Sequence, residues 1–237
     1  MGSHAILDEN SRVLKAKKIQ VLVHKYGNFG MRKMLEVGCG SGFLAHYFSH
    51  MGYGEKGTHS LDVVDERQIK KGYQFQCIQG TKLPFPDADF DFMISNHVVE
   101  HVGSREEQSR HIGEMFRCLE AGGVLYFAVP NRWRLFESHY KLPLLSWFSE
   151  KGSSAYVRFF RRGSYYDCNP LSRRETIKLL SSAGFEFKDA TLDSIAILGE
   201  IEGNFLIKWI AKLPKVFWMP FLVIMPTLIF VCRKPML

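Results

Sequence analysis

Apolar runs of strand length recur along the chain and alternate with stretches in which apolar residues follow helical spacing. The runs occupy residues 34–37, 58–64, 73–78, 90–95 and 124–129, and the run at 58–64 is the weakest. Because strands that are joined through helices pair in parallel, this alternation predicts βαβ units around a mostly parallel sheet, an α/β fold. A further run, TLIFVCRKP from residue 227, predicts the last strand.

Three helices are predicted from apolar periodicity and capping signals. Residues 11–26 carry apolar residues beside a basic face, which indicates an amphipathic N-terminal helix ending at Gly27. The basic face consists of Arg12, Lys15, Lys17 and Lys18. Two S-x-x-E sequences, Ser104–Glu107 and Ser172–Glu175, match the capping box, in which each side chain bonds an unpaired backbone N–H. These two helices are expected to end at glycines, Gly122 and Gly184.

Two segments interrupt the alternation. Residues 131–170 are aromatic and basic without clean periodicity, and we expect them to form an insertion on the substrate side. Residues 200–225 form an apolar insertion before the last strand. A chain of 237 residues with 46% hydrophobic content buries one sizeable core, so one domain spanning 1–237 is expected.

The charge and the cysteine content indicate which kinds of partner and which cellular location are compatible with the sequence. The net charge of +7 permits an anionic partner such as nucleic acid, a phosphorylated lipid or a membrane surface. Five widely spaced cysteines without a C-x-x-C pair suggest neither a disulfide framework nor a cysteine zinc site. The first ten residues lack the apolar core of a signal peptide. These features favour a cytoplasmic location, with membrane association left open, and they do not predict the oligomeric state.

A glycine-rich turn is the strongest candidate for a ligand site. KMLEVGCGSGF, residues 33–43, places glycines at 38, 40 and 42 directly after an apolar run. A turn between a strand ending at Val37 and a helix starting near Ser41 bares backbone N–H groups to a ligand. The nicotinamide fingerprint G-x-G-x-x-G requires a glycine at position 43, which is Phe43.

Two carboxylates beside this turn narrow the ligand class. Glu36 opposes a pyrophosphate and suits a ligand that carries an ammonium or sulfonium group. Asp62 falls at the end of the second strand, where a carboxylate accepts hydrogen bonds from ribose hydroxyls, and Asp65 competes for that role.

Four motifs in this order resemble those of the class I S-adenosylmethionine-dependent methyltransferases, of the methyltransferase type 11 kind. They are LEVGCGSG, LDVVDE, LPFPDADFDFMISNHVVEHV and CLEAGGVLYFAVPN, and together they cover residues 34–131. The resemblance implies a three-layer Rossmann-like sandwich with a seven-stranded sheet whose last strand is antiparallel. It also implies S-adenosyl-L-methionine as cofactor.

The same resemblance implies a set of cofactor-binding positions. Glu36 and Gly38 are expected at the methionyl end and Asp62 at the ribose. The adenine is expected near residues 79–82, although CIQGTKLPF lacks the Asp that many relatives carry there. The full set of expected cofactor residues is Glu36, Gly38, Cys39, Gly40, Gly42, Asp62, Val63, Gln79, Gly80, Thr81, Asn96 and His97.

Acceptor residues are expected beyond the fifth strand, because ligands bind past the carboxyl ends of parallel strands. The candidates there are Asn131, Glu137, His139 and Tyr140. A neutral imidazole, with a pKa of ~6.5, suits the removal of a hydroxyl proton during methylation. His139 is the first candidate base, followed by His101 and His97; a purely structural role for His139 or His101 remains open.

Several functions remain open at this stage. The main hypothesis is O-methylation of a small or lipid-linked acceptor of glycan, polyprenyl or quinone type, with peripheral membrane contact. The aromatic and basic residues 156–166 allow a second hypothesis, an RNA methyltransferase, although no RNA-binding signature accompanies them and nucleic acid is the less expected partner.

Two further hypotheses belong to other functional classes. HVVEH, residues 97–101, also matches a zinc-hydrolase motif with both histidines on one helical face, although no metal is expected. A binding module without catalysis is the last alternative. The apolar stretch 217–231 contains two prolines and is too short to span a bilayer, which takes ~20 residues.

Overall fold

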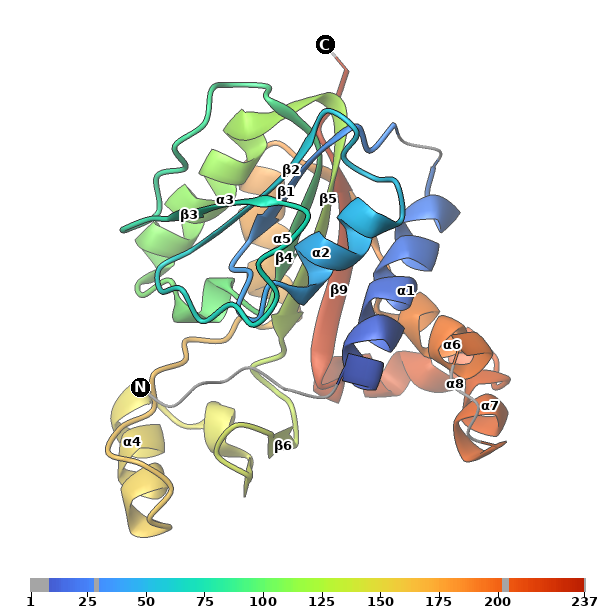
Figure 1. The fold of residues 1–237 in the computed structure, drawn as a ribbon. Coiled ribbons are helices and arrows are strands. Elements are labelled where there is room, and N and C mark those ends of the chain that lie inside the picture. Colours follow the sequence, from blue (N-terminus) through green and yellow to red (C-terminus); the bar gives the residue numbers. More distant parts are fainter. Residues whose placement is uncertain (1–8, 28–29, 202–204, 237) are drawn as a thin grey trace.

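A seven-stranded sheet forms the middle of three layers (Figure 1). The structure is a computed structural model and describes residues 9–27, 30–201 and 205–236. The strand order is β3-β2-β1-β4-β5-β9-β8, and β9 runs antiparallel to both of its neighbours. The strands are β1 (Lys33–Val37), β2 (Gly57–Asp62), β3 (Gln74–Cys77), β4 (Phe90–Asn96), β5 (Leu119–Pro130), β8 (Glu186–Asp189) and β9 (Thr227–Arg233). The predicted α/β fold with a reversed last strand is confirmed.

Helices cover both faces of this sheet. Helices α3 (Arg105–Cys118) and α5 (Arg173–Ser182) pack on one face. On the other face lie α1 (Glu9–Lys25), α2 (Phe43–His50) and α6 (Thr191–Ile201). The central strand β4 is buried on both faces from Phe90 to Ser95, which explains its uninterrupted apolar sequence.

Both predicted capping boxes are present, but the first helix is shorter than expected. Ser104 and Ser172 accept from the backbone of Glu107 and Glu175, whose side chains bond back. Helix α3 ends at Cys118, so the expectation that it runs to Gly122 was wrong. Leu119 is already extended, at φ −80° and ψ 135°, and pairs with Phe90 as the first residue of β5.

The N-terminal helix is where the sequence predicted it, but its basic face is partly turned inward. Ala16, Ile19, Leu22 and Val23 of α1 are buried in the core. Lys17 is exposed, whereas the other basic residues of that face, Arg12, Lys15 and Lys18, are partly buried. The end of α1 is fixed by Asp193 of α6, which accepts hydrogen bonds from Lys25 and Tyr26 and pairs with Lys215, the first residue of α8 (Lys215–Trp218).

The segment 131–170 contains regular structure that the sequence did not predict. It holds a two-stranded hairpin of β6 (Phe136–Glu137) and β7 (Leu142–Pro143), the 3₁₀ helix η2 (Leu145–Trp147) and helix α4 (Glu150–Phe159). The second insertion forms the end of α6, then α7 (Phe205–Ala211), α8 (Lys215–Trp218) and η3 (Met219–Ile224). Residues 202–204 of this insertion, and residues 1–8, where the sequence predicted no leader, lie outside the described residues.

Both insertions extend from the same end of the sheet. The first follows the carboxyl end of β5, and the second precedes β9, which starts at that end because it is antiparallel to β5. In Figure 1 this is the lower end of the sheet, with α4 on the left and α7 and α8 on the right. No helix among the described residues has the length and apolarity needed to cross a bilayer.

Candidate cofactor and acceptor site

The glycine-rich turn lies between β1 and α2, which begins at Phe43, two residues later than the predicted start near Ser41. All three glycines have positive φ, at 75°, 49° and 76° for Gly38, Gly40 and Gly42. A Cβ at Gly38 would lie 2.3 Å from Val98 Cγ2, and one at Gly42 would lie 2.5 Å from the carbonyl oxygen of Ile69. A Cβ at Gly40 would meet no atom within 4 Å. Gly40 is therefore where the main chain faces open space, whereas the other two glycines allow close packing within the protein.

Asp62 is fixed beside this open position. Its Oδ2 accepts from the N–H of Gly40 at 2.8 Å, and its Oδ1 accepts from the N–H of Val63 at 2.7 Å. Each carboxylate oxygen keeps a further lone pair for a ligand hydroxyl. The competitor Asp65 is instead occupied by Arg67, at 2.8 Å, and by Lys70.

Glu36 lies buried beneath the turn. Its Oε2 accepts from the N–H of Ala45 at 2.8 Å, and burial raises the pKa of Glu36 to about 8. Arg12 and Lys15 of α1 interact electrostatically with this carboxylate, and burial lowers the pKa of Lys15 to about 8. These two cations were not predicted as site residues. Their spacing of three residues beside the apolar stripe of α1 is the only sequence signal that they face inward.

The remaining predicted cofactor residues surround the same end of the sheet. The N–H of Ile78 donates to the carbonyl of Asp62 at 2.9 Å, which holds the loop carrying Gln79, Gly80 and Thr81 beside β2. Gln79 and Gly80 are exposed and Thr81 is partly buried.

Three other predicted cofactor residues differ in exposure. Cys39 is buried, which raises the pKa of its thiol, whereas Val63 is exposed. Asn96 is partly buried at the last position of β4.

A buried carboxylate lies between two histidines at the end of β4. Glu100 is only 2% exposed; His97 Nδ1 lies 3.6 Å and His101 Nε2 lies 3.9 Å from its Oε1. Burial acts to raise the pKa of Glu100, but His97 and His101 outweigh it and keep the pKa below its ordinary value. The Nε2 of His97 lies 3.5 Å from Thr227 Oγ1.

The helix required by the zinc-hydrolase hypothesis is absent from this part of the chain. His97 has φ 60°, and only the 3₁₀ helix η1 (Val99–His101) follows it. The expectation that both histidines lie on one helical face was therefore wrong.

The predicted acceptor residues of the insertion are largely engaged within the protein. Asn131 is buried; its amide donates to the carbonyl of Val223 at 2.7 Å and accepts from the N–H of Trp133. Glu137 is buried, pairs with Arg134 and accepts from the N–H of Tyr140 at 2.7 Å.

The other two acceptor candidates lie further along the hairpin. His139 is exposed in the turn between β6 and β7, in a different segment from His97 and His101. The hydroxyl of Tyr140 donates to Asp167 Oδ1 at 2.8 Å.

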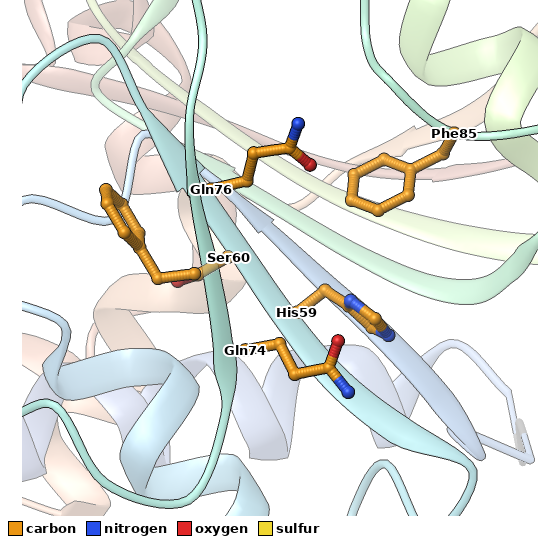
Figure 2. Close-up of a pocket in the computed structure, with 6 residues that line it drawn as sticks. His59, Ser60, Gln74, Gln76 and Phe85 are labelled. Carbon is orange, nitrogen blue, oxygen red and sulfur yellow. The ribbon is translucent and has the colours of Figure 1, made fainter.

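A small cavity of about 130 Å³ lies elsewhere, at the outer edge of the sheet (Figure 2). Its lining residues are His59, Ser60, Gln74, Phe75, Gln76 and Phe85. They come from β2, from the edge strand β3 and from the loop before β4. Because no predicted site residue lines this cavity, it is separate from the candidate site.

Comparison with known proteins gives consistent matches. Residues 35–127 match the family model described as a methyltransferase domain. A probable S-adenosylmethionine-dependent methyltransferase of Mycolicibacterium smegmatis is 27% identical over 161 residues, which cover 67% of this chain and 53% of that protein. An uncharacterized methyltransferase of Mycobacterium sp. (strain KMS) is 34% identical over 101 residues, or 40% of this chain and 37% of that protein. The chain thus spans about half the length, or less, of these two relatives.

A solved structure shares the fold. The S-adenosylmethionine-dependent methyltransferase from Mesorhizobium loti aligns with a TM-score of 0.62 and covers 93% of this chain and 98% of its own. At 12% sequence identity, this likeness shows the fold alone.

Proposed function

The chain belongs to the class I S-adenosylmethionine-dependent methyltransferases, and we propose that it methylates an oxygen atom of a small or lipid-linked apolar acceptor. The cofactor of this family, S-adenosyl-L-methionine, supplies a methyl group on a sulfonium that is open to in-line displacement. In such a reaction the protein contributes mainly by binding and alignment. The acceptor, the atom that is methylated and the residues in each role are parts of the proposal.

The glycine turn fits this cofactor better than a dinucleotide. The open backbone at Gly40 and the carboxylate of Asp62 lie together, as a nucleoside with free ribose hydroxyls requires. The Asp62 carboxylate beside the open backbone would repel a diphosphate. We assign residues 79–81 to the adenine. The amino-acid end of the cofactor carries both an ammonium and a carboxylate, which suit Glu36 and the cations Arg12 and Lys15 respectively.

The main observation that supports O-methylation is that the Glu100 carboxylate lies beside His97. With Nδ1–H directed at Glu100, the Nε2 of His97 is the nitrogen that accepts a hydroxyl proton, once the acceptor hydroxyl replaces its 3.5 Å contact with Thr227 Oγ1. The buried carboxylate then stabilises the imidazolium. His97 is therefore preferred over His139, which lies on the exposed turn of the hairpin. Asn131 and Glu137 act as positioning residues that hold the insertion in place.

Exposed aromatic residues on both insertions support an apolar or lipid-linked acceptor. We define the α4 cluster as Trp147, Phe148, Phe159 and Phe160, and the C-terminal cluster as Phe205, Trp209, Val216, Phe217, Met219, Phe221 and Val223. Phe159 and Phe205 are 80% and 83% exposed. Large apolar side chains that are exposed in groups are typical of an interaction site. Both clusters belong to segments at the carboxyl end of the sheet (Figure 1), the end at which we expect the acceptor to bind.

Calorimetry followed by a mass-shift screen tests this function. We expect binding of S-adenosylmethionine and S-adenosylhomocysteine but not of NAD. With polyprenyl, quinone or glycolipid acceptors we expect a mass gain of one methylene per turnover. Replacement His97→Gln should lower kcat at least ~10²-fold, a larger factor than any loss of S-adenosylhomocysteine affinity. Turnover only with amine or carbon acceptors would refute O-methylation.

RNA methylation is the second candidate, because three arginines at the end of α4, Arg158, Arg161 and Arg162, are exposed beside Phe159 and Phe160. Binding to RNA that weakens steeply with salt, together with methylated nucleosides, would favour it over a lipid-linked acceptor.

A further inference from the structure

A second group of reactive side chains lies where the insertion returns to the sheet. The Sγ of Cys168 is 3.9 Å from His101 Nδ1 and 3.5 Å from Asp167 Oδ1. One ligand atom from each of these residues lies within 4.8 Å of the other two. The three residues thus bring a thiol, an imidazole and a carboxylate together, although His101 is 66 or more positions away in sequence.

Two of the three separations are close to those around a single tetrahedral ion, and the imidazole and the carboxylate, which lie within 4.8 Å of each other, would have to approach more closely. Zinc binds sulfur at about 2.3 Å and nitrogen or oxygen at about 2.0–2.2 Å, so its ligand atoms lie roughly 3.3–3.6 Å apart. The thiol to carboxylate distance of 3.5 Å already matches, and the thiol to imidazole distance of 3.9 Å requires a small side-chain adjustment.

The surroundings of the group match those of a metal centre. The opposite nitrogen of His101, Nε2, faces Glu100, which gives the carboxylate–histidine arrangement found behind metal-bound imidazoles. The second oxygen of Glu100, Oε2, is buried without a hydrogen-bond partner. On the other side, the hydroxyl of Tyr140 orients Asp167 at 2.8 Å.

The backbone also holds the ligands in place. The N–H of Asn169 donates to the carbonyl of Glu100 at 2.7 Å, and Gln108 donates to both Val99 and Asn169 at 2.9 Å. These bonds fix the segment that carries Asp167 and Cys168 against η1, so ordering the site takes little further conformational entropy.

We propose that His101, Asp167 and Cys168 bind one Zn²⁺ ion, with Glu100 orienting His101. The thiol loses its proton to solvent and binds as thiolate, and a water molecule takes the fourth position. The ion joins the end of the insertion to η1 beside the proposed acceptor site. This ligand set differs from HVVEH, which would use both His97 and His101, and it does not depend on the proposed methyl transfer.

Metal binding to the full chain tests the proposal. After treatment with a chelator, the protein should take up one equivalent of Zn²⁺ by elemental analysis. Co²⁺ in its place should give a thiolate-to-cobalt charge-transfer absorption. X-ray absorption of the zinc-loaded wild type should show one sulfur neighbour, a result that does not depend on any variant folding.

Matched variants locate the site. Cys168→Ser should abolish the cobalt charge-transfer band, and Glu100→Gln should weaken zinc binding by about 10-fold or more. Cys77→Ser, which changes an exposed cysteine on β3, should bind as the wild type does. Binding of S-adenosylhomocysteine by Cys168→Ser reports that this variant is folded. Absence of stoichiometric metal, a band that persists in Cys168→Ser, or a zinc shell without sulfur would overturn the proposal.

Discussion

The three glycines of the turn serve two physically different purposes. At Gly38 and Gly42 a side chain would collide with Val98 or with Tyr73 and Ile69, so glycine there permits the strand, the turn and the following loop to pack. At Gly40 the space is open and the adjacent carboxylate belongs to Asp62. Stability and ligand affinity should therefore respond differently to substitution within one five-residue stretch.

Gly40→Ala and Gly42→Ala separate these two purposes. Both place a non-glycine residue at positive φ, at a cost of about 1–2 kcal/mol. Only Gly42→Ala adds a clash with the Ile69 carbonyl, for a further ~1–3 kcal/mol. We expect Gly42→Ala to show the lower urea midpoint. Gly40→Ala should stay folded and lose at least ~10-fold in S-adenosylhomocysteine affinity by calorimetry. Unchanged affinity in Gly40→Ala would show that the ligand does not approach this position.

His111 of α3 should make stability depend on acid pH. It is 4% exposed, its Nε2 has no hydrogen-bond partner, and burial lowers its pKa to about 4 from 6.5. Between these pH values the unfolded chain binds a proton that the folded chain does not bind. The free energy of unfolding is therefore unaffected by the titration of His111 above pH 6.5 and falls as the pH drops from 6.5 to 4. The total decrease that His111 causes is about 3 kcal/mol.

Unfolding free energies measured from pH 7 to pH 4 check this. The slope of the unfolding free energy against pH should become flatter in His111→Gln. The same slope should stay unchanged in His50→Gln, which alters an exposed histidine. Equal slopes in His111→Gln and the wild type would contradict the assignment, whatever the absolute stability of the variant.

At the residue scale, the arrangement of the candidate site could be predicted from the sequence where neighbours in the chain define it. Gly40 and Asp62 follow strand ends and could be predicted from the turn and the alternation. The pairing of Cys168 with His101 could not, because it depends on how the insertion returns to η1. The inward direction of Lys15 was also missed, because a helical pattern of lysines normally indicates a solvated face.

At the scale of elements, local signals predicted strands and caps better than short insertions. The two capping boxes are local in sequence and were found, whereas β8 and α6 were not predicted. Strands β6 and β7 have two residues each, too few for any periodicity. Their hairpin is instead fixed by a buried ion pair of Arg134 with Glu137, whose side chains are 5% and 0% exposed.

Breaking this pair should destabilise the insertion strongly. Glu137→Gln leaves the Arg134 guanidinium buried without a counter-charge, a loss typically of about 3–5 kcal/mol. Glu120→Gln is the matched control, since Glu120 pairs with Arg32 at a site where both side chains are well exposed. That change should cost less than ~1 kcal/mol. Urea unfolding, with limited proteolysis of residues 131–170, measures both. Equal effects of the two changes would show that the buried pair does not hold the hairpin.

At the scale of the whole molecule, topology brings two distant segments to one end of the sheet. The α4 cluster and the C-terminal cluster belong to the two insertions at this end although more than forty residues separate them in the chain. Exposed lysines, Lys208 and Lys212, accompany the second cluster. Aromatic residues with adjacent cations are typical of proteins that rest in the headgroup zone of a bilayer. A lipid-linked acceptor could then be reached without leaving the membrane.

Sedimentation with lipid vesicles tests this arrangement. The wild type should bind anionic vesicles more tightly than neutral ones, because each lysine near the surface contributes about 1 kcal/mol. Trp209→Ser should weaken binding to both kinds of vesicle by roughly 10- to 150-fold, since it removes about 1.5–3 kcal/mol of apolar burial. The double variant with Lys208→Gln and Lys212→Gln should weaken only binding to anionic vesicles, and added salt should reproduce that effect.

Met51→Ser is the control: it changes an exposed apolar residue just after α2 and should have no effect on vesicle binding. If Trp209→Ser and Met51→Ser bind equally well, the C-terminal cluster does not enter the membrane, and its apolar surface must instead contact the acceptor or another protein.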